Sequence, residues 1–202
     1  MSRPRGRPPG GPGAERNREG ILGAARELFA EKGFERTTMR SVATRAGVDA
    51  ALIHHYFGTK RGLLLAALRP PEDLTADVRR RLVEVRAGSG EVGVELVRAV
   101  VTLWDEHPEV RHRMIALIRV ALVDDDVAES FRTLVVGMVS GMLGDLIRPD
   151  RSEERIALAV SQTMGLAMSR FIIALPPIAE ASADELASTV GVTVHRYLTG
   201  DL

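Results

Sequence analysis

Hydrophobic residues recur every three or four positions along most of the chain, which is the spacing of one face of an α-helix. In the N-terminal third, this period predicts helices over residues 14–33, 39–46, 50–57 and 60–69. Beyond the Pro70-Pro71 pair, it predicts six more helices, over residues 72–86, 92–106, 109–123, 127–147, 153–175 and 183–198. The pattern therefore predicts an all-α fold of about nine or ten helices.

The turn between the predicted helices 39–46 and 50–57 is the most informative break in this pattern. Gly47 permits the positive φ that a sharp turn between helices needs, and Val48 is expected to fill the inside of the corner. Thr38 and Asp49 are candidate N-caps for the helices on either side. Three short helices joined in this way predict a helix-turn-helix, whose second short helix enters the major groove of DNA.

Composition limits the other classes of protein. The chain has 202 residues, of which 45% are hydrophobic and 4% aromatic, and it has no cysteine. An all-β fold is therefore not expected, and the lack of cysteine is typical of the cytoplasm, where we place the protein. The basic N-terminus has no apolar stretch that would make it a signal peptide, and the apolar residues 156–175 contain Gln162 and Arg170, so we expect no membrane segment.

The two parts of the chain differ in charge although the formal net charge of the whole is zero. Residues 1–69 contain 13 Lys and Arg against 6 Asp and Glu, whereas residues 70–202 contain 14 against 21. A basic N-terminal third on an acidic remainder indicates a module that contacts nucleic acid, joined to a body that does not.

At this point a family resemblance is plain. The residues that carry it are Gly33-Phe34, Thr37-Thr38-Met39-Arg40-Ser41-Val42-Ala43, Ala46-Gly47-Val48, Ile53, Tyr56-Phe57, Lys60 and Leu63, which resemble the DNA-binding domain of the TetR family of transcriptional repressors. The resemblance implies an all-helical homodimer whose C-terminal domain binds a small molecule and thereby releases DNA. We accordingly expect a disordered basic arm over residues 1–13, the DNA-binding domain over 14–69 and a ligand-binding and dimerisation domain over 70–202.

The resemblance also assigns roles to single residues. Thr38 and Arg40 match positions that hold a DNA phosphate, Ala50, Ala51 and His54 match groove-contacting positions, and His55, Tyr56 and Lys60 match backbone contacts. Because alanine has no hydrogen-bonding side chain, Ala50 and Ala51 would contact only thymine methyl groups or permit close approach. Structural roles stay open: Thr38 as a mere N-cap, Tyr56 as half core, and the histidines as solvated side chains.

The N-terminal arm suggests a second DNA contact. Arg3, Arg5 and Arg7 lie in an Arg-Gly-Arg-Pro context that resembles an AT-hook, in which an extended segment occupies the narrow minor groove of A·T-rich DNA. A disordered solubilising tail is the equal alternative.

The larger domain carries weaker signals for dimerisation and ligand binding. Small residues at positions 137, 140, 141 and 144, and at 161, 165 and 169, predict a self-association surface, with packing inside one chain as the alternative. An apolar ligand pocket is expected among the middle helices, formed by Trp104, Met114, Leu117, Ile118, Phe131, Met138, Met164, Met168 and Phe171. For Arg119 or Arg170 on these helices, we favour a protein carboxylate over an acidic ligand as the partner.

The sequence thus predicts a ligand-responsive, dimeric transcriptional regulator that binds a double-stranded DNA operator. No convergent acid–base set is present. Glu109 and His112 have the spacing found at carboxylate-bridged metal sites, but such sites need a second copy, which the sequence lacks. We therefore predict that the protein is not an enzyme and has neither cofactor nor metal. The alternative is a nucleoid-type architectural protein that binds A·T-rich DNA without an effector.

Overall fold

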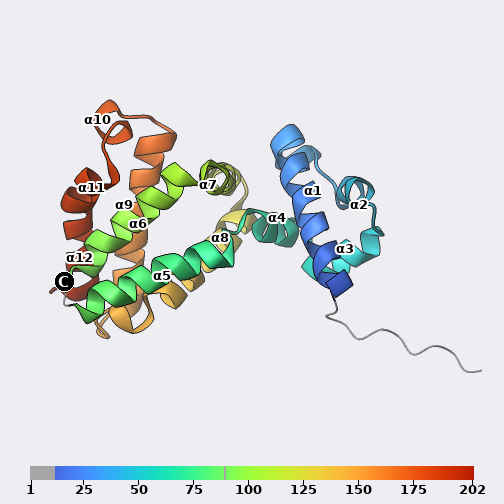
Figure 1. Cartoon of the computed structure of the whole chain (residues 1–202). Coiled ribbons are helices and arrows are strands. Elements are labelled where there is room, and N and C mark those ends of the chain that lie inside the picture. The colour runs from blue at the N-terminus through green and yellow to red at the C-terminus, as the bar shows by residue number, and fades with distance from the viewer. Residues whose placement is uncertain (1–11, 89) are drawn as a thin grey trace, which may run out of the picture. The chain divides into compact units, whose positions relative to one another are not determined.

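The computed structural model describes residues 12–88 and 90–202, and every regular element in these ranges is helical (Figure 1). The prediction of an all-α fold is therefore confirmed. The chain divides into two compact units, one ending at Arg69 and the other running from Pro70 to Leu202. Within the described ranges, no helix combines the length and the apolar character needed to cross a membrane.

The first unit consists of four helices: α1 (Pro12–Arg36), α2 (Met39–Ala46), α3 (Ala50–Phe57) and α4 (Lys60–Leu68). The long helix α1 packs against α2 and α4, and α3 packs against both α2 and α4. Regular helical geometry in α1 is broken at Gly33, where φ is 77° and ψ is 173°. The core of the unit consists of apolar side chains from all four helices, among them Ile21, Ala25, Leu28, Val42, Ile53, Leu63 and Leu64.

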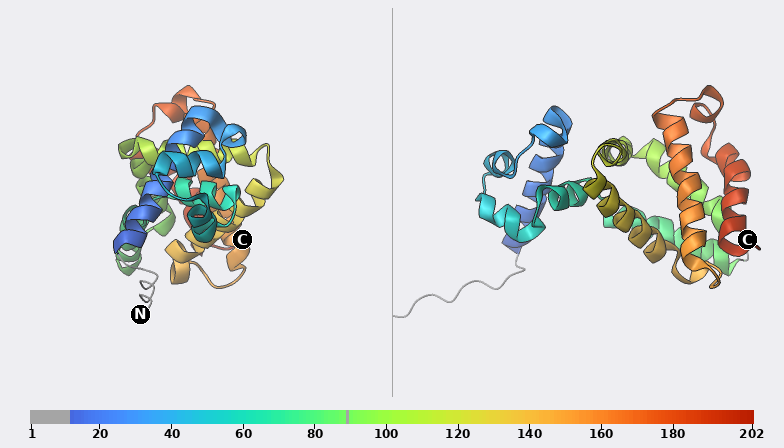
Figure 2. Two further views of the ribbon diagram at one scale, coloured as in Figure 1. Left: turned by 90° about the vertical axis from the view of Figure 1, so that its right-hand side faces the viewer. Right: turned by 180° about the vertical axis from the view of Figure 1, so that it is seen from behind.

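The second unit begins with α5 (Glu72–Ala87), α6 (Val92–Glu106), α7 (Pro108–Ala121) and α8 (Asp125–Leu143). It continues through a 3₁₀ turn (Gly144–Leu146), α9 (Ser152–Phe171) and the short helix α10 (Pro176–Ala179). It ends with α11 (Ala183–Leu186), one π turn (Ala187–Gly191) and α12 (Val192–Thr199), which follow each other without a break. Helices α9 and α12 pack side by side, as the right-hand view of Figure 2 shows.

Helix α6 lies at the centre of the second unit, packed against α5, α7, α11, the π turn and α12. Two glycines let the backbones of these elements approach closely. A Cβ atom added to Gly93 would lie 2.7 Å from the carbonyl carbon of Val194, and one added to Gly191 would lie 2.7 Å from the Cα of Val94. Because real Cβ atoms do not come so near to backbone, only glycine fits at either position.

Two predicted helix ends in the second unit are wrong, and one short helix was not predicted. Helix α8 ends at Leu143 because Gly144 leaves helical geometry, with φ 45° and ψ −119°. Helix α9 ends at Phe171, short of the predicted residue 175, and the chain turns at Ala174, whose φ is 55°. Pro176, expected only as a break, begins α10, since proline suits the first turn of a helix.

A buried arginine joins the end of the chain to the turn before α9. The side chain of Arg155 is fully buried and donates to the carbonyl oxygens of Tyr197 at 2.7 Å and Gly200 at 2.9 Å. Its Nη2 also pairs with a carboxylate oxygen of Asp150 at 3.0 Å. A buried charge is tolerated only when it is paired and hydrogen-bonded, as this one is.

Candidate nucleic-acid interface

Helices α2 and α3 form the predicted helix-turn-helix. Gly47 ends α2 in the left-handed conformation, with φ 67° and ψ 32°, and the backbone N–H of Val48 donates to the carbonyl of Ala43 at 3.0 Å. Asp49 then caps α3, because its carboxylate accepts from the N–H of Ala51 at 2.7 Å. The turn is thus fixed by local hydrogen bonds and one positive φ, as its sequence predicts.

Two adjacent threonines begin α2 and have different roles. The hydroxyl oxygen of Thr38 accepts from the N–H of Ser41 at 3.0 Å, and the Ser41 hydroxyl accepts from the N–H of Thr38 at 3.1 Å, forming a capping box. Thr38 is exposed, and its own hydroxyl hydrogen is not consumed by this cap, so the N-cap role and a phosphate contact are compatible. Thr37 is fully buried instead, with its hydroxyl 2.8 Å from the carbonyl oxygen of Gly33.

Arg45 connects α2 to α1 through two carboxylates. Its guanidinium lies 3.0 Å from Glu27 and donates two hydrogen bonds to Glu31, at 3.1 and 3.0 Å. The hydrogen bond from this guanidinium holds the pKa of the Glu31 carboxyl below its usual value. Glu27 and Glu31 lie one turn apart on α1, so the arrangement fixes the orientation of α2 on that helix.

The side chains of α3 divide into a buried and an exposed face. Ile53 is completely buried and anchors the helix to the unit's core. Ala51, His54 and His55 are exposed, and Ala50 is half-buried at the start of the helix. The structure therefore brings the predicted groove-contacting residues together on one short helix and leaves their side chains accessible.

His54 has a defined tautomer when it is neutral. Its Nδ1 lies 2.9 Å from the carbonyl oxygen of Gly58. Because a carbonyl oxygen only accepts hydrogen bonds, Nδ1 carries the hydrogen, and Nε2 of the neutral ring is then an acceptor. The exposed His54 side chain thus offers one hydrogen-bond acceptor at the surface of α3.

Two predicted DNA-backbone contacts have partners inside the first unit. The Lys60 ammonium donates to the carbonyl of Phe34 at 2.9 Å and lies 4.2 Å from the centre of the Phe34 ring. Tyr56 is half-buried, and its hydroxyl lies 3.4 Å from the carbonyl oxygen of Ala14. Both side chains therefore contribute to the packing of the unit, in addition to any contact that they make with DNA. Arg40 is exposed on α2.

The arm arginines Arg3, Arg5 and Arg7 lie outside the described residues. Sequence reasoning also missed Thr37 as a buried anchor, because two neighbouring threonines both suit an N-cap by residue type. It missed Arg45 as well, although Glu27 and Glu31, spaced one turn apart on α1, were a usable signal for a basic partner.

The residues predicted to line a ligand pocket are mostly in the core of the second unit. Trp104, Leu117 and Ile118 are buried, and Met114, Met138 and Met168 are half-buried. Phe171 stacks edge to face on Trp104, with ring centres 5.7 Å apart. Phe131 and Met164 of the predicted set line one pocket together with six further residues.

Arg119 and Arg170, the two arginines considered as partners of an acidic ligand, differ in their surroundings. Arg170 pairs with Asp105 at 3.0 Å and donates to the carbonyls of Ile178 and Ala181, both at 2.7 Å. A protein carboxylate is therefore its partner, as favoured from the sequence. Arg119 is exposed on α7.

Comparison with known proteins identifies the family. Residues 21–67 match the family described as bacterial regulatory proteins, tetR family, and residues 90–198 match the tetracyclin repressor-like C-terminal domain. The chain belongs to the TetR family. This TetR-family protein is accordingly a DNA-binding transcriptional regulator, and the recognition made from its helix-turn-helix residues is confirmed.

Individual relatives span nearly the whole chain. The transcriptional regulator BetI of Agrobacterium fabrum is 29% identical over 177 residues, which are 84% of this chain and 83% of that protein. A TetR-family regulator from Streptomyces coelicolor is 33% identical, with a TM-score of 0.68 over 96% of this chain and 99% of that one. NalD, a secondary repressor of a multidrug efflux pump in Pseudomonas aeruginosa, shares the fold, at 19% identity and a TM-score of 0.57 over 94% of this chain and 98% of that one.

Proposed function

We propose that this protein is a transcriptional repressor that binds a palindromic operator as a homodimer and leaves it when a small molecule binds the second unit. The observation that carries the proposal is the complete helix-turn-helix inside the family-matched residues 21–67, with an exposed face on α3. We place the protein in the cytoplasm, where operator DNA lies. The domain limits are those expected from the sequence: an arm over 1–13, DNA binding over 14–69, and dimerisation with ligand sensing over 70–202.

The exposed face of α3 supports a specific contact with bases. Ala50 and Ala51 would approach thymine methyl groups, while Nε2 of the neutral His54 would accept a hydrogen bond from the N6 amino group of adenine or the N4 amino group of cytosine. Thr38 would donate to a phosphate at the N-terminus of α2, where the helix dipole favours an anion. Arg40, His55, Tyr56 and Lys60 are proposed as further backbone contacts.

Small residues on α8 and α9 support dimerisation through these helices. A Cβ atom added to Gly137, Gly141 or Gly165 would meet no other atom within 4 Å, so packing inside one chain does not require glycine there. This disfavours the alternative of close intrachain packing at these three positions. A two-fold dimer would present two copies of α3 to the two halves of a palindrome, and an effector would act by changing their spacing.

The first test is binding of the full chain to DNA from its own upstream region. Fluorescence anisotropy would compare that DNA with random DNA of equal length over a series of salt concentrations. We expect two protomers per site and a preference of about a thousandfold for the upstream DNA, together with weaker specific binding by His54→Phe. The exposed His112, on α7 of the other unit, provides the matched control His112→Phe. Equal affinity for upstream and random DNA, and for every operator-sized fragment selected from a random pool, would contradict the repressor proposal and favour an architectural protein.

Dimerisation has a separate test. Gly165→Arg is expected to lower the dimer fraction measured by analytical ultracentrifugation, whereas Gly20→Arg, on the exposed surface of α1, is not. Deleting residues 2–9 tests the arm: reduced affinity with a shallower salt dependence would support a minor-groove contact. Unchanged affinity and salt dependence would contradict that contact.

A further inference from the structure

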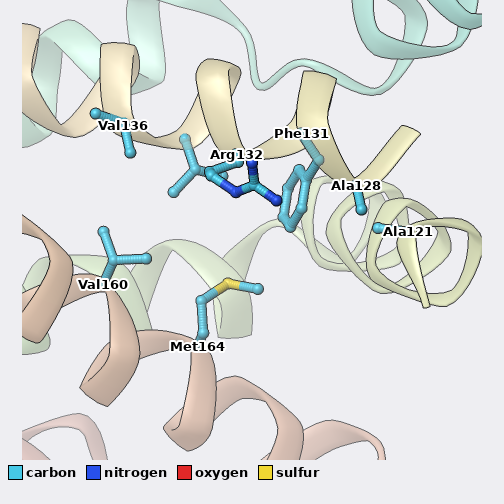
Figure 3. A pocket seen from close by; sticks show the side chains of 8 residues that line it. Ala121, Ala128, Phe131, Arg132, Val136, Val160 and Met164 are labelled. Atoms are coloured by element: carbon cyan, nitrogen blue, oxygen red, sulfur yellow. The ribbon is translucent and has the colours of Figure 1, made fainter. Parts of the chain in front are cut away.

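Residues of α8 and α9, with Ala121 at the end of α7, line an open pocket of about 220 Å³ in the second unit (Figure 3). Most of its wall comes from one face of α8 between positions 128 and 136, and the opposite side comes from Val160 and Met164 of α9. The lining residues are Ala121, Ala128, Phe131, Arg132, Val135, Val136, Val160 and Met164. Seven of the eight are apolar and none is acidic, so the wall has a single charged group.

That charge, the guanidinium of Arg132, lies beside the Phe131 ring in the close view (Figure 3). In residues 12–88 and 90–202, Arg132 has no carboxylate within ion-pair distance and no hydrogen-bond acceptor. Three other arginines of the second unit are paired, Arg155 with Asp150, Arg170 with Asp105 and Arg98 with Glu95, whereas Arg132 is exposed. Arg132 therefore differs from them in having five N–H donors without a protein partner beside an apolar surface.

We propose that this pocket binds a small organic monoanion, with its apolar body against Phe131, Val136 and Met164 and its carboxylate on Arg132. A guanidinium offers two parallel N–H groups that match the two oxygens of a carboxylate. A cationic ligand would meet a like charge and no acidic side chain on this wall. That such a ligand acts as the effector rests on the proposed repressor function. That it binds in this pocket does not.

The volume limits the size of the ligand. A cavity of roughly 150 Å³ lined by aliphatic and aromatic side chains holds benzene. The pocket here, at about 220 Å³, therefore has room for one ring or a short branched chain together with a carboxylate.

Acidic residues at the start of α8 are the main objection to an anionic ligand. Asp125 and Asp126 precede Arg132 by six or seven residues, a separation of roughly 10 Å along a helix, and both are exposed. Exposed charges at that distance are largely screened at physiological salt. Glu129 is nearer and also exposed, but it forms no ion pair with Arg132, so the guanidinium stays available.

Isothermal titration calorimetry of the full chain tests the proposal with matched probes that differ in charge. Cyclohexanecarboxylate is the anionic probe, cyclohexanecarboxamide the neutral one and cyclohexylmethylammonium the cationic one. Benzoate is a second anionic probe, with a flat ring in place of the puckered one. We expect measurable binding of a carboxylate, binding of the amide weaker by about tenfold or more, and no binding of the ammonium ion.

Variants locate the binding to this pocket. Arg132→Gln is expected to weaken carboxylate binding by about tenfold or more, and Arg132→Lys to restore part of it, because lysine keeps the charge without the paired N–H groups. Val160→Trp fills the pocket and is expected to abolish binding. The control is Arg119→Gln, which removes an exposed arginine of α7 that does not line the pocket. Circular dichroism confirms that each variant is folded.

Four results would overturn the proposal: neither carboxylate binds, the amide binds as tightly as the acid, Arg132→Gln has no effect, or binding survives in a folded Val160→Trp. Loss of the dimer in Val160→Trp, with no carboxylate bound to the wild type, would assign the pocket to a second copy of the chain. Operator binding is measured separately without any probe, so its failure contradicts the repressor proposal while the calorimetry still decides the pocket. Carboxylate binding that leaves the protein on its operator supports the site and excludes this ligand class as the effector.

Discussion

Glycine is required for two different reasons in this TetR-family regulator, and the clearest examples of each lie in different units. In the first unit, Gly33 breaks α1 and Gly47 and Gly58 end helices, all three with positive φ; a Cβ would have free space there, but the backbone conformation would be strained for any other residue. In the second unit, Gly93 and Gly191 do not have a positive φ. Glycine is required there because the backbones of two packed elements nearly touch. At these positions the first unit depends on local turns, and the second on contacts between segments distant in the sequence.

The largest effect that would sharpen this comparison is expected at Arg155. Replacing it by Met removes the partner of two partly buried carbonyls and of Asp150, which should lower the free energy of unfolding of the second unit by about 3 to 5 kcal/mol. Denaturant unfolding followed by circular dichroism measures the loss. Arg151→Met is the control, because Arg151 is exposed and contacts Glu154 at the surface; equal losses in the two variants would show that burial of Arg155 is unimportant.

The next effect concerns the close approach at α6. Gly93→Ala places a Cβ against the backbone of α12, and we expect a loss of about 3 kcal/mol from the shift that this forces. Gly20→Ala, on the exposed side of α1, should leave stability unchanged or raise it by up to about 1 kcal/mol through helix propensity. Thermal unfolding compares them, and a Gly93→Ala variant as stable as the wild type would contradict the packing described here.

Capping boxes occur in both units and allow a matched test. Thr38→Ala and Ser182→Ala each remove a side-chain cap, and each should cost about 1 kcal/mol of stability. Only Thr38→Ala is expected also to weaken binding to operator DNA, because only that helix N-terminus belongs to the proposed interface. If Ser182→Ala weakens DNA binding as much as Thr38→Ala does, the loss comes from general destabilisation rather than from a phosphate contact.

The smallest effect is a pH dependence in the first unit. The Arg45 hydrogen bond holds the pKa of Glu31 below its usual value in the folded protein. Its contribution to stability is therefore present above the unfolded-state pKa and is lost as pH falls through the folded-state pKa. Glu31→Gln should melt slightly below the wild type at pH 7, and the difference in melting temperature should vanish in acid. A difference that persists unchanged at pH 3 would mean that the Glu31 charge is not responsible.

For the first unit, the sequence alone predicted α2 and α3 with their observed boundaries. The reason is physical: Thr38, Asp49 and Gly47 act within a few residues of themselves, through caps and a left-handed turn, so residue type is enough. The α3 residues expected to face DNA came from the family resemblance, and Ala51 and His54 among them are exposed. The resemblance assigned Lys60 to DNA without foreseeing its bond to the end of α1, because that contact spans 26 residues.

For the second unit, the sequence predicted helices over most of the observed positions but not their partners. Helical periodicity marks an apolar face without saying which helix covers it, so Trp104, Leu117 and Ile118 were predicted for a pocket and lie in the core. The unpartnered guanidinium of Arg132 and the close backbone approach at Gly93 depend on which helices meet and at what distance. Those relations arise from packing among segments far apart along the chain, and only the tertiary structure decided them.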